Sequence, residues 1–168
     1  MLGLAGEDPL YGLTELRDVP AAAVIALNNA HEIETSRLDP DSYECLLATS
    51  SVAICIGTSP DAFLIAFDER SDHPNENLAW FRARHDRFLY VDRIIVAEAA
   101  RGRGLARALY RALLARAILE ERRLIGCEIN LDPPNLASDR LHESIGFAEI
   151  GQRDVAAGKR IRYMALAL

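Results

Sequence analysis

The sequence predicts an α/β fold in which helices cover both faces of a mixed sheet. Short β-branched runs alternate along the chain with longer stretches rich in alanine and leucine. The strongest predicted strand, Phe88–Val96, precedes the longest predicted helix, Leu105–Arg123, and the strand Leu124–Leu131 follows. A strand, a helix and a strand in this order are typical of a crossover between parallel strands. The predicted order is β-α-α-β-β-β-α-β-α-β-β, and we expect a single domain over residues 1–168.

Composition and charge exclude several classes of protein. The net charge of −6 argues against a general nucleic-acid binder, which usually needs a basic surface. The chain begins with no basic, apolar leader and has no apolar run near the roughly 20 residues of a membrane span, so we expect a cytoplasmic protein with no membrane partner. The four histidines show no metal-ligand spacing, and we expect no metal. Cys45, Cys55 and Cys127 form no C-x-x-C pair and are expected to be buried thiols.

The N-terminal part of the chain predicts one strand and two helices. Thr14–Val19 is the first predicted strand. A proline then opens the predicted helix Ala21–Ile33, because proline is tolerated in the first turn. The second predicted helix, Asp39–Ala48, starts with an aspartate that can cap it and a proline in its first turn.

A hairpin and a long polar connection follow. Val52–Ile56 and Ala62–Phe67 are apolar strands joined by a turn rich in Gly, Ser and Pro. Asp68–Arg84 is predicted to be a long connection, and such segments are often functional. It holds the adjacent aromatics Trp80 and Phe81, which either line a pocket or fix the connection to the core.

The C-terminal half begins with the central strand Phe88–Val96, in which Asp92 and Arg93 interrupt an apolar run. Charges inside a buried strand are costly unless they are paired, so these two require an explanation. After a Pro-Pro break, Asn135–Ile145 is predicted to be a helix ended by a glycine. Phe147–Arg153 and Arg160–Leu168 are the last predicted strands. Four arginines of the long helix are expected to lie on a solvated face: Arg107, Arg111, Arg122 and Arg123.

The junction between the central strand and the long helix has the composition of an anion site. It contains Arg101, Gly102, Arg103 and Gly104, directly before a helix whose first amides are unpaired. Glycines let a phosphate approach the backbone, and arginines add donors. A Rossmann site would need a third glycine where Arg107 stands, and a Walker loop would need Gly-Lys-Ser/Thr. A tight turn with a packing role only is the remaining alternative.

The segment Arg101-Gly102-Arg103-Gly104-Leu105-Ala106 resembles the R/Q-x-x-G-x-G/A signature of the GNAT superfamily of N-acetyltransferases. Further along, the segment Asn135–Phe147 is similar to the family's N-x-x-S/A…L-Y-x-x-x-G-F element. The two elements occur in the family's order and at its distance. The match is strong over residues 88–151, and parts of it resemble a little-studied bacterial subgroup of predicted acetyltransferases.

The resemblance implies the fold, the activity and the co-substrate. It implies a GNAT-like mixed, mostly antiparallel sheet and transfer of an acetyl group from acetyl-CoA to an amine. Backbone amides of Arg101–Ala106 would hold the pyrophosphate, and the backbone of Ile94, Ile95 and Val96 would pair with the pantetheine arm. Asn135 and Ser138 of the second element would also contact coenzyme A. No metal is implied, and a homodimer would fit the family's habit.

Attack of an amine on a thioester requires a base for the amine, a donor for the oxyanion and help for the departing thiolate. His142 stands where the family usually has the tyrosine acid, and it is either that acid or a helix histidine contacting Glu143 or solvent. Asp92 and Glu128, on two central strands, are the candidate bases. Asp92 can instead pair with an arginine, and Glu128 can simply support the sheet. The resemblance implies that the end of the first predicted helix borders the acceptor pocket, so three residues there are candidates for acceptor specificity: His31, Glu32 and Glu34.

Three functions stay open at this point. The first is an N-acyltransferase acting on a small-molecule or protein amine. The second is an acyl-CoA-binding sensor without catalysis, suggested by the missing tyrosine. The third is a structural domain whose glycine turn binds nothing.

Overall fold

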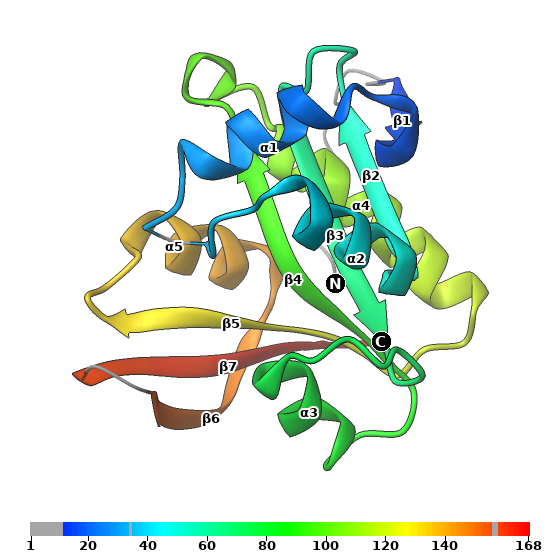
Figure 1. Cartoon of the computed structure of the whole chain (residues 1–168). Coiled ribbons are helices and arrows are strands. Elements are labelled where there is room, and N and C mark those ends of the chain that lie inside the picture. Colours follow the sequence, from blue (N-terminus) through cyan, green and yellow to red (C-terminus); the bar gives the residue numbers. More distant parts are fainter. Residues whose placement is uncertain (1–11, 34, 156–157) are drawn as a thin grey trace.

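The computed structural model describes residues 12–33, 35–155 and 158–168. Its core is a seven-stranded sheet in the order β1-β2-β3-β4-β5-β7-β6 (Figure 1). Among the strands of the described residues, β4 and β5 alone pair in parallel, so the sheet is mixed and mostly antiparallel, as predicted. The strands are β1 (Leu13–Glu15), β2 (Val52–Ile56), β3 (Ala62–Asp68), β4 (Phe88–Val96), β5 (Leu124–Asp132), β6 (Ala148–Val155) and β7 (Lys159–Ala167).

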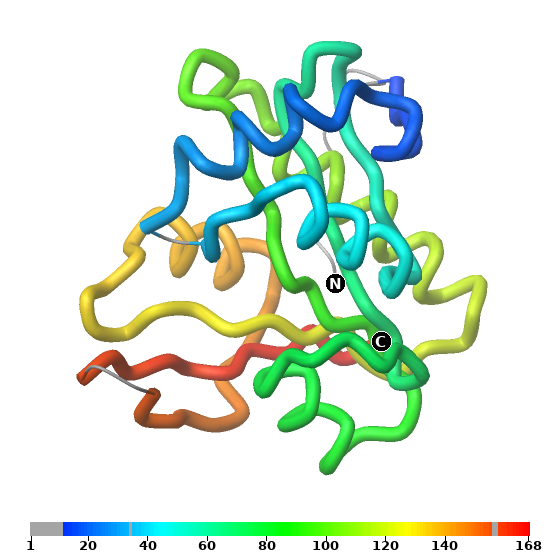
Figure 2. Tube along the Cα trace, viewed as in Figure 1, coloured from blue at the N-terminus to red at the C-terminus, as the bar shows by residue number. Residues whose placement is uncertain are grey.

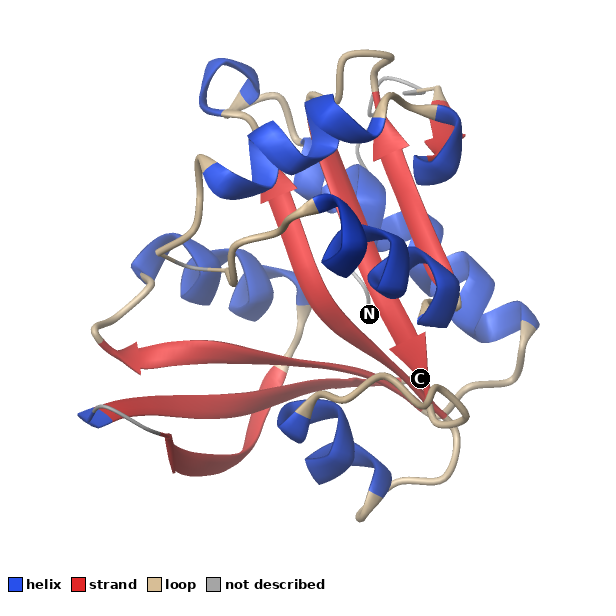
Figure 3. Cartoon of the chain, in the orientation of Figure 1, coloured by secondary structure: helices blue, strands red, loops and turns tan. Residues whose placement is uncertain are grey.

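Helices cover both faces of the sheet, which confirms the predicted fold class (Figure 3). One apolar core lies between the sheet and α1, α2 and α3. A second core lies between the opposite face and α4 and α5. The helices are α1 (Ala21–Asn29), α2 (Pro40–Thr49), α3 (Glu76–Arg82), α4 (Leu105–Leu119) and α5 (Leu136–Ile145).

Helix α3 lies inside the segment that the sequence analysis treats as a polar connection. Its N-cap is Asn75, whose side-chain oxygen accepts hydrogen bonds from two backbone amides of the first turn. Its own residues Leu78 and Phe81 are fully buried. Trp80 stacks on Tyr163 of β7, with ring centroids 3.9 Å apart. The two adjacent aromatics therefore attach this segment to the core.

Several element boundaries differ from the prediction. The first strand is short, and Leu16–Asp18 forms a 3-10 turn instead. Helix α1 ends at Asn29 because the side chains of Asn28 and Asn29 bond the backbone of the following loop at Ser36 and Leu38. Helix α4 ends at Leu119, shortly before the chain turns through Glu121, which has a φ of 54°.

Two predicted environments are wrong. Arg122 does not lie on a solvated face, because its side chain is only 6% exposed and pairs with Asp68, Glu69 and Glu120. It lies beyond the end of α4, where the chain turns into the sheet. Cys45 is exposed on α2, whereas Cys55 and Cys127 are buried.

The two central strands separate in the middle of the molecule. β4 and β5 pair only from Phe88 to Val91 and from Leu124 to Cys127. Beyond these residues β4 turns toward α1 and β5 turns away from it (Figures 1 and 2). Asp92, the next residue of β4, has no partner on β3 and is the additional residue of a β-bulge. The divergence leaves one side of β4 from Asp92 onward without a strand partner among the described residues.

Candidate functional site

The glycine loop before α4 forms the outer end of the site. Gly102 and Gly104 have φ values of 77° and 76°, which favour glycine, and no atom lies within 4 Å of a Cβ built on either. No side chain caps α4. Within the described chain, nothing accepts a hydrogen bond from the backbone amides of Gly104, Leu105 and Ala106. The first turn of α4 therefore presents open amides and a positive dipole end.

Three adjoining cavities run inward from this loop. The loop cavity, about 210 Å³, is lined by residues around Arg101 to Arg107. It shares lining residues with the middle cavity, about 380 Å³, which follows β4 from Ile94 to Val96 and reaches α5. The middle cavity in turn shares lining residues with the inner cavity, about 100 Å³, between β4 and β5. One continuous cleft thus joins the start of α4 to the point where the strands separate.

The predicted cofactor-binding residues follow this cleft. Those that line the loop or the middle cavity are Ile94, Ile95, Val96, Arg101, Gly102, Gly104, Leu105, Ala106, Asn135 and Ser138. Arg103 is the exception, because its guanidinium pairs with Asp61 at 3.0 Å. Asn135 caps α5 through its side-chain oxygen, which accepts from the Ser138 amide at 3.1 Å. Its side-chain nitrogen has no acceptor within the described chain.

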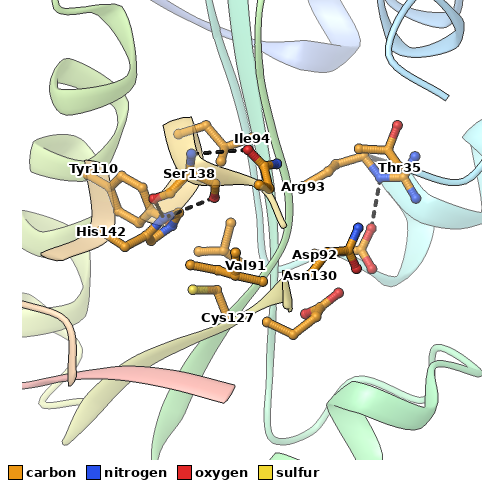
Figure 4. Close-up of a pocket in the computed structure, with 13 residues that line it drawn as sticks. Thr35, Val91, Asp92, Arg93, Ile94, Tyr110, Cys127, Asn130, Ser138 and His142 are labelled. Carbon is orange, nitrogen blue, oxygen red and sulfur yellow. Dashed lines mark hydrogen bonds and ion pairs between the residues drawn. The ribbon is translucent and has the colours of Figure 1, made fainter. Parts of the chain in front are cut away.

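The inner cavity brings together the three predicted catalytic residues, Asp92, Glu128 and His142. In Figure 4, Tyr110, His142 and Ser138 lie on one side of this cavity, whereas Asp92, Arg93 and Thr35 lie on the other. The first group comes from α4 and α5 and the second from β4 and the loop after α1. The cleft is therefore bounded by side chains from both faces of the sheet.

Asp92 is held as a paired carboxylate. One oxygen accepts from Arg93 Nε at 2.8 Å, and the other accepts from Asn75 Nδ2 at 2.7 Å. The side chains of Asp92 and Arg93 are each only 6% exposed. Arg93 also donates to Asn28 Oδ1 at 2.7 Å and to the Ser36 hydroxyl at 3.1 Å. The bulge and this ion pair explain how two charges are accommodated in an otherwise apolar strand.

Glu128 is the carboxylate with the more unusual environment. The Tyr90 hydroxyl donates a hydrogen bond to it at 2.5 Å, while part of its side chain remains exposed to the cleft. Burial raises the pKa of Glu128 to about 7, and the nearby charge of Asp92 acts in the same direction. The Tyr90 hydrogen bond opposes this rise. A carboxyl with a pKa near neutrality can take up and release protons at physiological pH.

The His142 side chain is buried, and its hydrogen-bond partners among the described residues are Tyr110 and Ser138 rather than Glu143. It is 2% exposed, and its ring lies edge-on to Tyr110 and Phe147. Nε2 lies 2.6 Å from the Tyr110 hydroxyl, and Nδ1 lies 2.7 Å from the Ser138 carbonyl oxygen. Burial lowers the pKa of His142, which favours the neutral ring.

The loop after α1 closes the outer side of the cleft. His31 lines the middle cavity, and its Nε2 accepts from Arg101 at 3.2 Å. Glu32 instead pairs with the exposed Arg37 at 3.0 Å. Glu34 lies outside the described residues. Of the three predicted specificity residues, His31 alone is placed by the structure against the cleft.

The sequence analysis missed several residues that shape this site. In the sequence pattern, Tyr90 and Tyr110 look like ordinary core residues. Their hydrogen bonds to Glu128 and His142, which are distant in the sequence, are what identify them as part of the site. Asn75 carries a recognisable signal, since an asparagine followed by apolar residues at helical spacing indicates an N-cap. Across the described residues, no cluster of three metal-ligating side chains occurs, and no helix has the length and apolarity to cross a membrane.

Comparison with known proteins assigns a family to this arrangement. The model of the "Acetyltransferase (GNAT) family" matches residues 27–147. An L-2,4-diaminobutyric acid acetyltransferase of Streptomyces anulatus is 35% identical over 117 residues. That match covers 69% of this chain and 56% of the relative, so this chain aligns with little more than half of the relative's length.

Solved structures share the fold at low identity. A ribosomal-protein-alanine N-acetyltransferase from Brucella melitensis has a TM-score of 0.68 at 19% identity, covering 94% of this chain and 99% of its own. The structure of yncA from Salmonella typhimurium, solved with its cofactor acetyl-CoA, has a TM-score of 0.68 at 19% identity, covering 94% and 93%. At this identity the likeness establishes the fold.

Proposed function

Because the chain belongs to the GNAT acetyltransferase family, we propose that it moves an acetyl group from acetyl-CoA to a primary amine by direct attack on the thioester. One observation carries the proposal. A continuous cleft leads from the open amides of α4 to Glu128, a carboxyl whose pKa is about 7. An anion site at one end and a proton acceptor at the other are what an acyl-CoA and an amine require.

The outer part of the cleft fits coenzyme A. The open amides of Gly104, Leu105 and Ala106 would hold the pyrophosphate at the helix N-terminus, where two glycines leave the backbone open to approach. The amide of Arg101, at the start of the predicted range Arg101–Ala106, instead donates to the Glu98 carbonyl at 3.2 Å. The free side of β4 at Ile94–Val96 offers backbone groups to the pantetheine arm. The side-chain nitrogen of Asn135 can donate to a carbonyl of that arm while its oxygen caps α5. Ser138, on the next turn, faces the same space.

The inner cavity fits the amine. An amine attacks only after losing a proton, and Glu128 is the proposed base because its pKa of about 7 suits that transfer. Asp92 is already bound by Arg93 and Asn75, so we assign it a supporting role. Its charge raises the pKa of Glu128 and attracts a cation. No covalent bond between the acetyl group and the protein is needed.

The acceptor is proposed to be a cationic primary amine that enters the inner cavity by its amino end. The cavity, about 100 Å³, admits a small group. The named relatives act on diaminobutyric acid and on a ribosomal-protein alanine, which supports either a small-molecule or a protein amine. The lining of the inner cavity includes two carboxyl groups, those of Asp92 and Glu128, and one guanidinium, that of Arg93. This excess of acidic groups favours a cationic acceptor.

The first test is calorimetric titration with acetyl-CoA of the wild type and of Gly104→Glu. A carboxylate at this position would oppose the pyrophosphate, and we expect at least a tenfold loss of affinity. Gly158→Glu is the matched control, because Gly158 has a φ of 72° with no atom within 4 Å of a built Cβ and lies in a distant turn. It should bind like the wild type. A wild type that binds no acetyl-CoA would refute the proposal.

The second test separates catalysis from binding alone. The protein is incubated with acetyl-CoA and a panel of amines, and release of the free thiol is followed. We expect amine-dependent thiol release that Glu128→Gln lowers at least a hundredfold without loss of acetyl-CoA binding. Binding without thioester consumption by any amine would instead favour the acyl-CoA sensor.

A further inference from the structure

The side chains of Tyr110 and His142 and the backbone carbonyl of Ser138 form a directed chain of hydrogen bonds along the α4–α5 side of the inner cavity. Tyr110 of α4 lies 2.6 Å from His142 Nε2, and His142 Nδ1 lies 2.7 Å from the carbonyl oxygen of Ser138. The Ser138 hydroxyl oxygen is 3.2 Å from the same Nδ1. Tyr110 and His142 are 3% and 2% exposed, whereas Ser138 is only partly buried. The chain therefore runs from the protein interior to the cleft.

The carbonyl of Ser138 fixes the direction of every bond in this chain. A carbonyl oxygen can only accept, so His142 Nδ1 must carry the ring proton. Nε2 is then an acceptor, and the Tyr110 hydroxyl is its donor. Both ring nitrogens of His142 are engaged within the protein. The Ser138 hydroxyl cannot donate to a protonated Nδ1, and the described structure holds no other acceptor for it. Its proton is free to point into the cleft.

Ser138 lies where the middle and inner cavities meet. The residues that line both the middle and the inner cavity are Thr35, Ile94, Asn135, Ser138 and His142. Two of these carry hydroxyl groups, and the Thr35 hydroxyl donates to the His31 carbonyl at 3.0 Å. Ser138 alone offers an uncommitted hydroxyl where the two cavities meet.

This inference rests on the proposed acyl transfer. We propose that the Ser138 hydroxyl donates the hydrogen bond that stabilises the departing thiolate, and that His142 and Tyr110 are positioning residues for it. In the step, one proton of the cationic amine has passed to Glu128, the amine nitrogen has bonded to the acyl carbon, and the second proton that this nitrogen must lose has passed to water. The carbon–sulfur bond then breaks and its electron pair stays on sulfur.

Ser138 keeps its proton throughout this step. Passing it on and recovering one through His142 would leave a buried tyrosinate, and burial raises the pKa of Tyr110 well above its usual value. The sulfur leaves as a thiolate held by the serine hydroxyl and takes a proton from water afterwards. Glu128 returns its own proton to solvent, so atoms and charge balance.

The first experiment reads the histidine directly, without substrate. Nitrogen-15 NMR of the wild type should show His142 protonated at Nδ1 and unprotonated at Nε2 between pH 6 and 8. In Tyr110→Phe the Nε2 resonance should shift, because its donor is lost. A wild-type ring protonated at Nε2 would overturn the proposal, whatever the protein catalyses.

The second experiment compares Ser138→Ala with Ser138→Thr in thiol-release kinetics and acetyl-CoA calorimetry. Removing a hydrogen bond to a charged group should lower kcat by about tenfold to a hundredfold in the alanine variant. The threonine variant, which keeps the hydroxyl, should retain most of the rate, and acetyl-CoA affinity should change less than threefold in both. A full rate in Ser138→Ala, or a loss confined to affinity, would overturn the proposal. A wild type inactive with every amine would instead count against the proposed function.

Discussion

The hydroxyl of Tyr90 on β4 donates a 2.5 Å hydrogen bond to Glu128 on β5. It joins the two strands beside the last residues that pair, just before they separate. A fully buried donor and a partly exposed acceptor thus meet at the bottom of the cleft. This contact links the fold to the proposed chemistry, because it holds the carboxyl of Glu128 in place and tunes its pKa.

The rate of acetyl transfer should rise with pH through about 7, the pKa of Glu128. The proposed base works only as a carboxylate, so we expect activity to be lost as pH falls through that value. Glu128→Gln should lower kcat/KM by roughly a hundredfold to ten-thousandfold, the usual range for a general base. The pH profile of kcat/KM measures both effects. Glu44→Gln, an exposed change on α2, should leave the profile unchanged.

Tyr90→Phe should move the acid limb of that profile to higher pH. The lost hydroxyl stabilises the ionised form of Glu128, so its removal raises the pKa further. Tyr43→Phe removes another buried hydroxyl, outside the cavity linings, and serves as the control. An unshifted limb in Tyr90→Phe would show that the hydrogen bond does not act on the base.

The free energy of unfolding should depend on pH through the titration of Glu128. Its pKa is about 7 in the folded chain against an ordinary 4.5, so between these values the folded state holds a proton that the unfolded state has lost. Stability from this group is fully present below about pH 4.5 and decreases as pH rises through 7. Glu128→Gln removes the decrease. Urea unfolding measures the free energy of unfolding of the wild type and of Glu128→Gln at pH 5 and at pH 8. The difference between the two proteins should change by about 1–2 kcal/mol between these pH values, a figure that allows for the partial exposure of Glu128.

Arg93→Met should be strongly destabilising. It leaves Asp92 as a buried charge without its arginine partner. It also removes the hydrogen bonds that Arg93 donates to the side-chain oxygens of Asn28 and Ser36. Breaking a buried pair from one side costs about 3–5 kcal/mol. Arg37→Met is the matched control, because Arg37 and Glu32 pair with side chains 73% and 51% exposed, and such pairs contribute about 0–1 kcal/mol. Thermal unfolding of both variants decides the comparison.

Gly126→Ala should loosen the attachment of α3. A Cβ built on Gly126 of β5 would lie 2.2 Å from Cε1 of Phe81, whose ring is fully buried. Overpacking of this kind costs about 1–3 kcal/mol. Gly12→Ala, where nothing lies within 4 Å, should have little effect. Equal melting temperatures for the two variants would show that Phe81 yields without cost.

The sequence predicted the features that depend on neighbours along the chain. The glycine loop, the strand before it and the helix after it follow from composition over a short stretch, because a helix N-terminus and glycine conformations are local properties. The prediction of β4 as Phe88–Val96 matches the structure at both ends. The cap at Asn135 is likewise local, since its side chain bonds an amide three residues away.

Helix α3 lies between these cases. Its N-cap and its apolar residues are present in the sequence, but a helix of seven residues is too short to be stable alone. It forms because Phe81 and Trp80 pack against β5 and β7, which no local pattern reveals.

Only the tertiary structure decided the chemistry of the titratable groups. In the sequence, Asp92 and Glu128 are equivalent candidates for the base. In the fold, Asp92 lies at the bulge and pairs with the charged Arg93, whereas Glu128 accepts a hydrogen bond from the neutral Tyr90. In the sequence, His142 is either an acid or a helix histidine in contact with Glu143 or solvent. In the fold it is buried, and Tyr110, 32 residues earlier, occupies its Nε2. The sequence by itself determined the strand β4, the helix α4 and the glycine loop between them, because these rest on local backbone and composition. The protonation state of each side chain depends on burial and distant partners, and these exist only once the strands and helices have assembled.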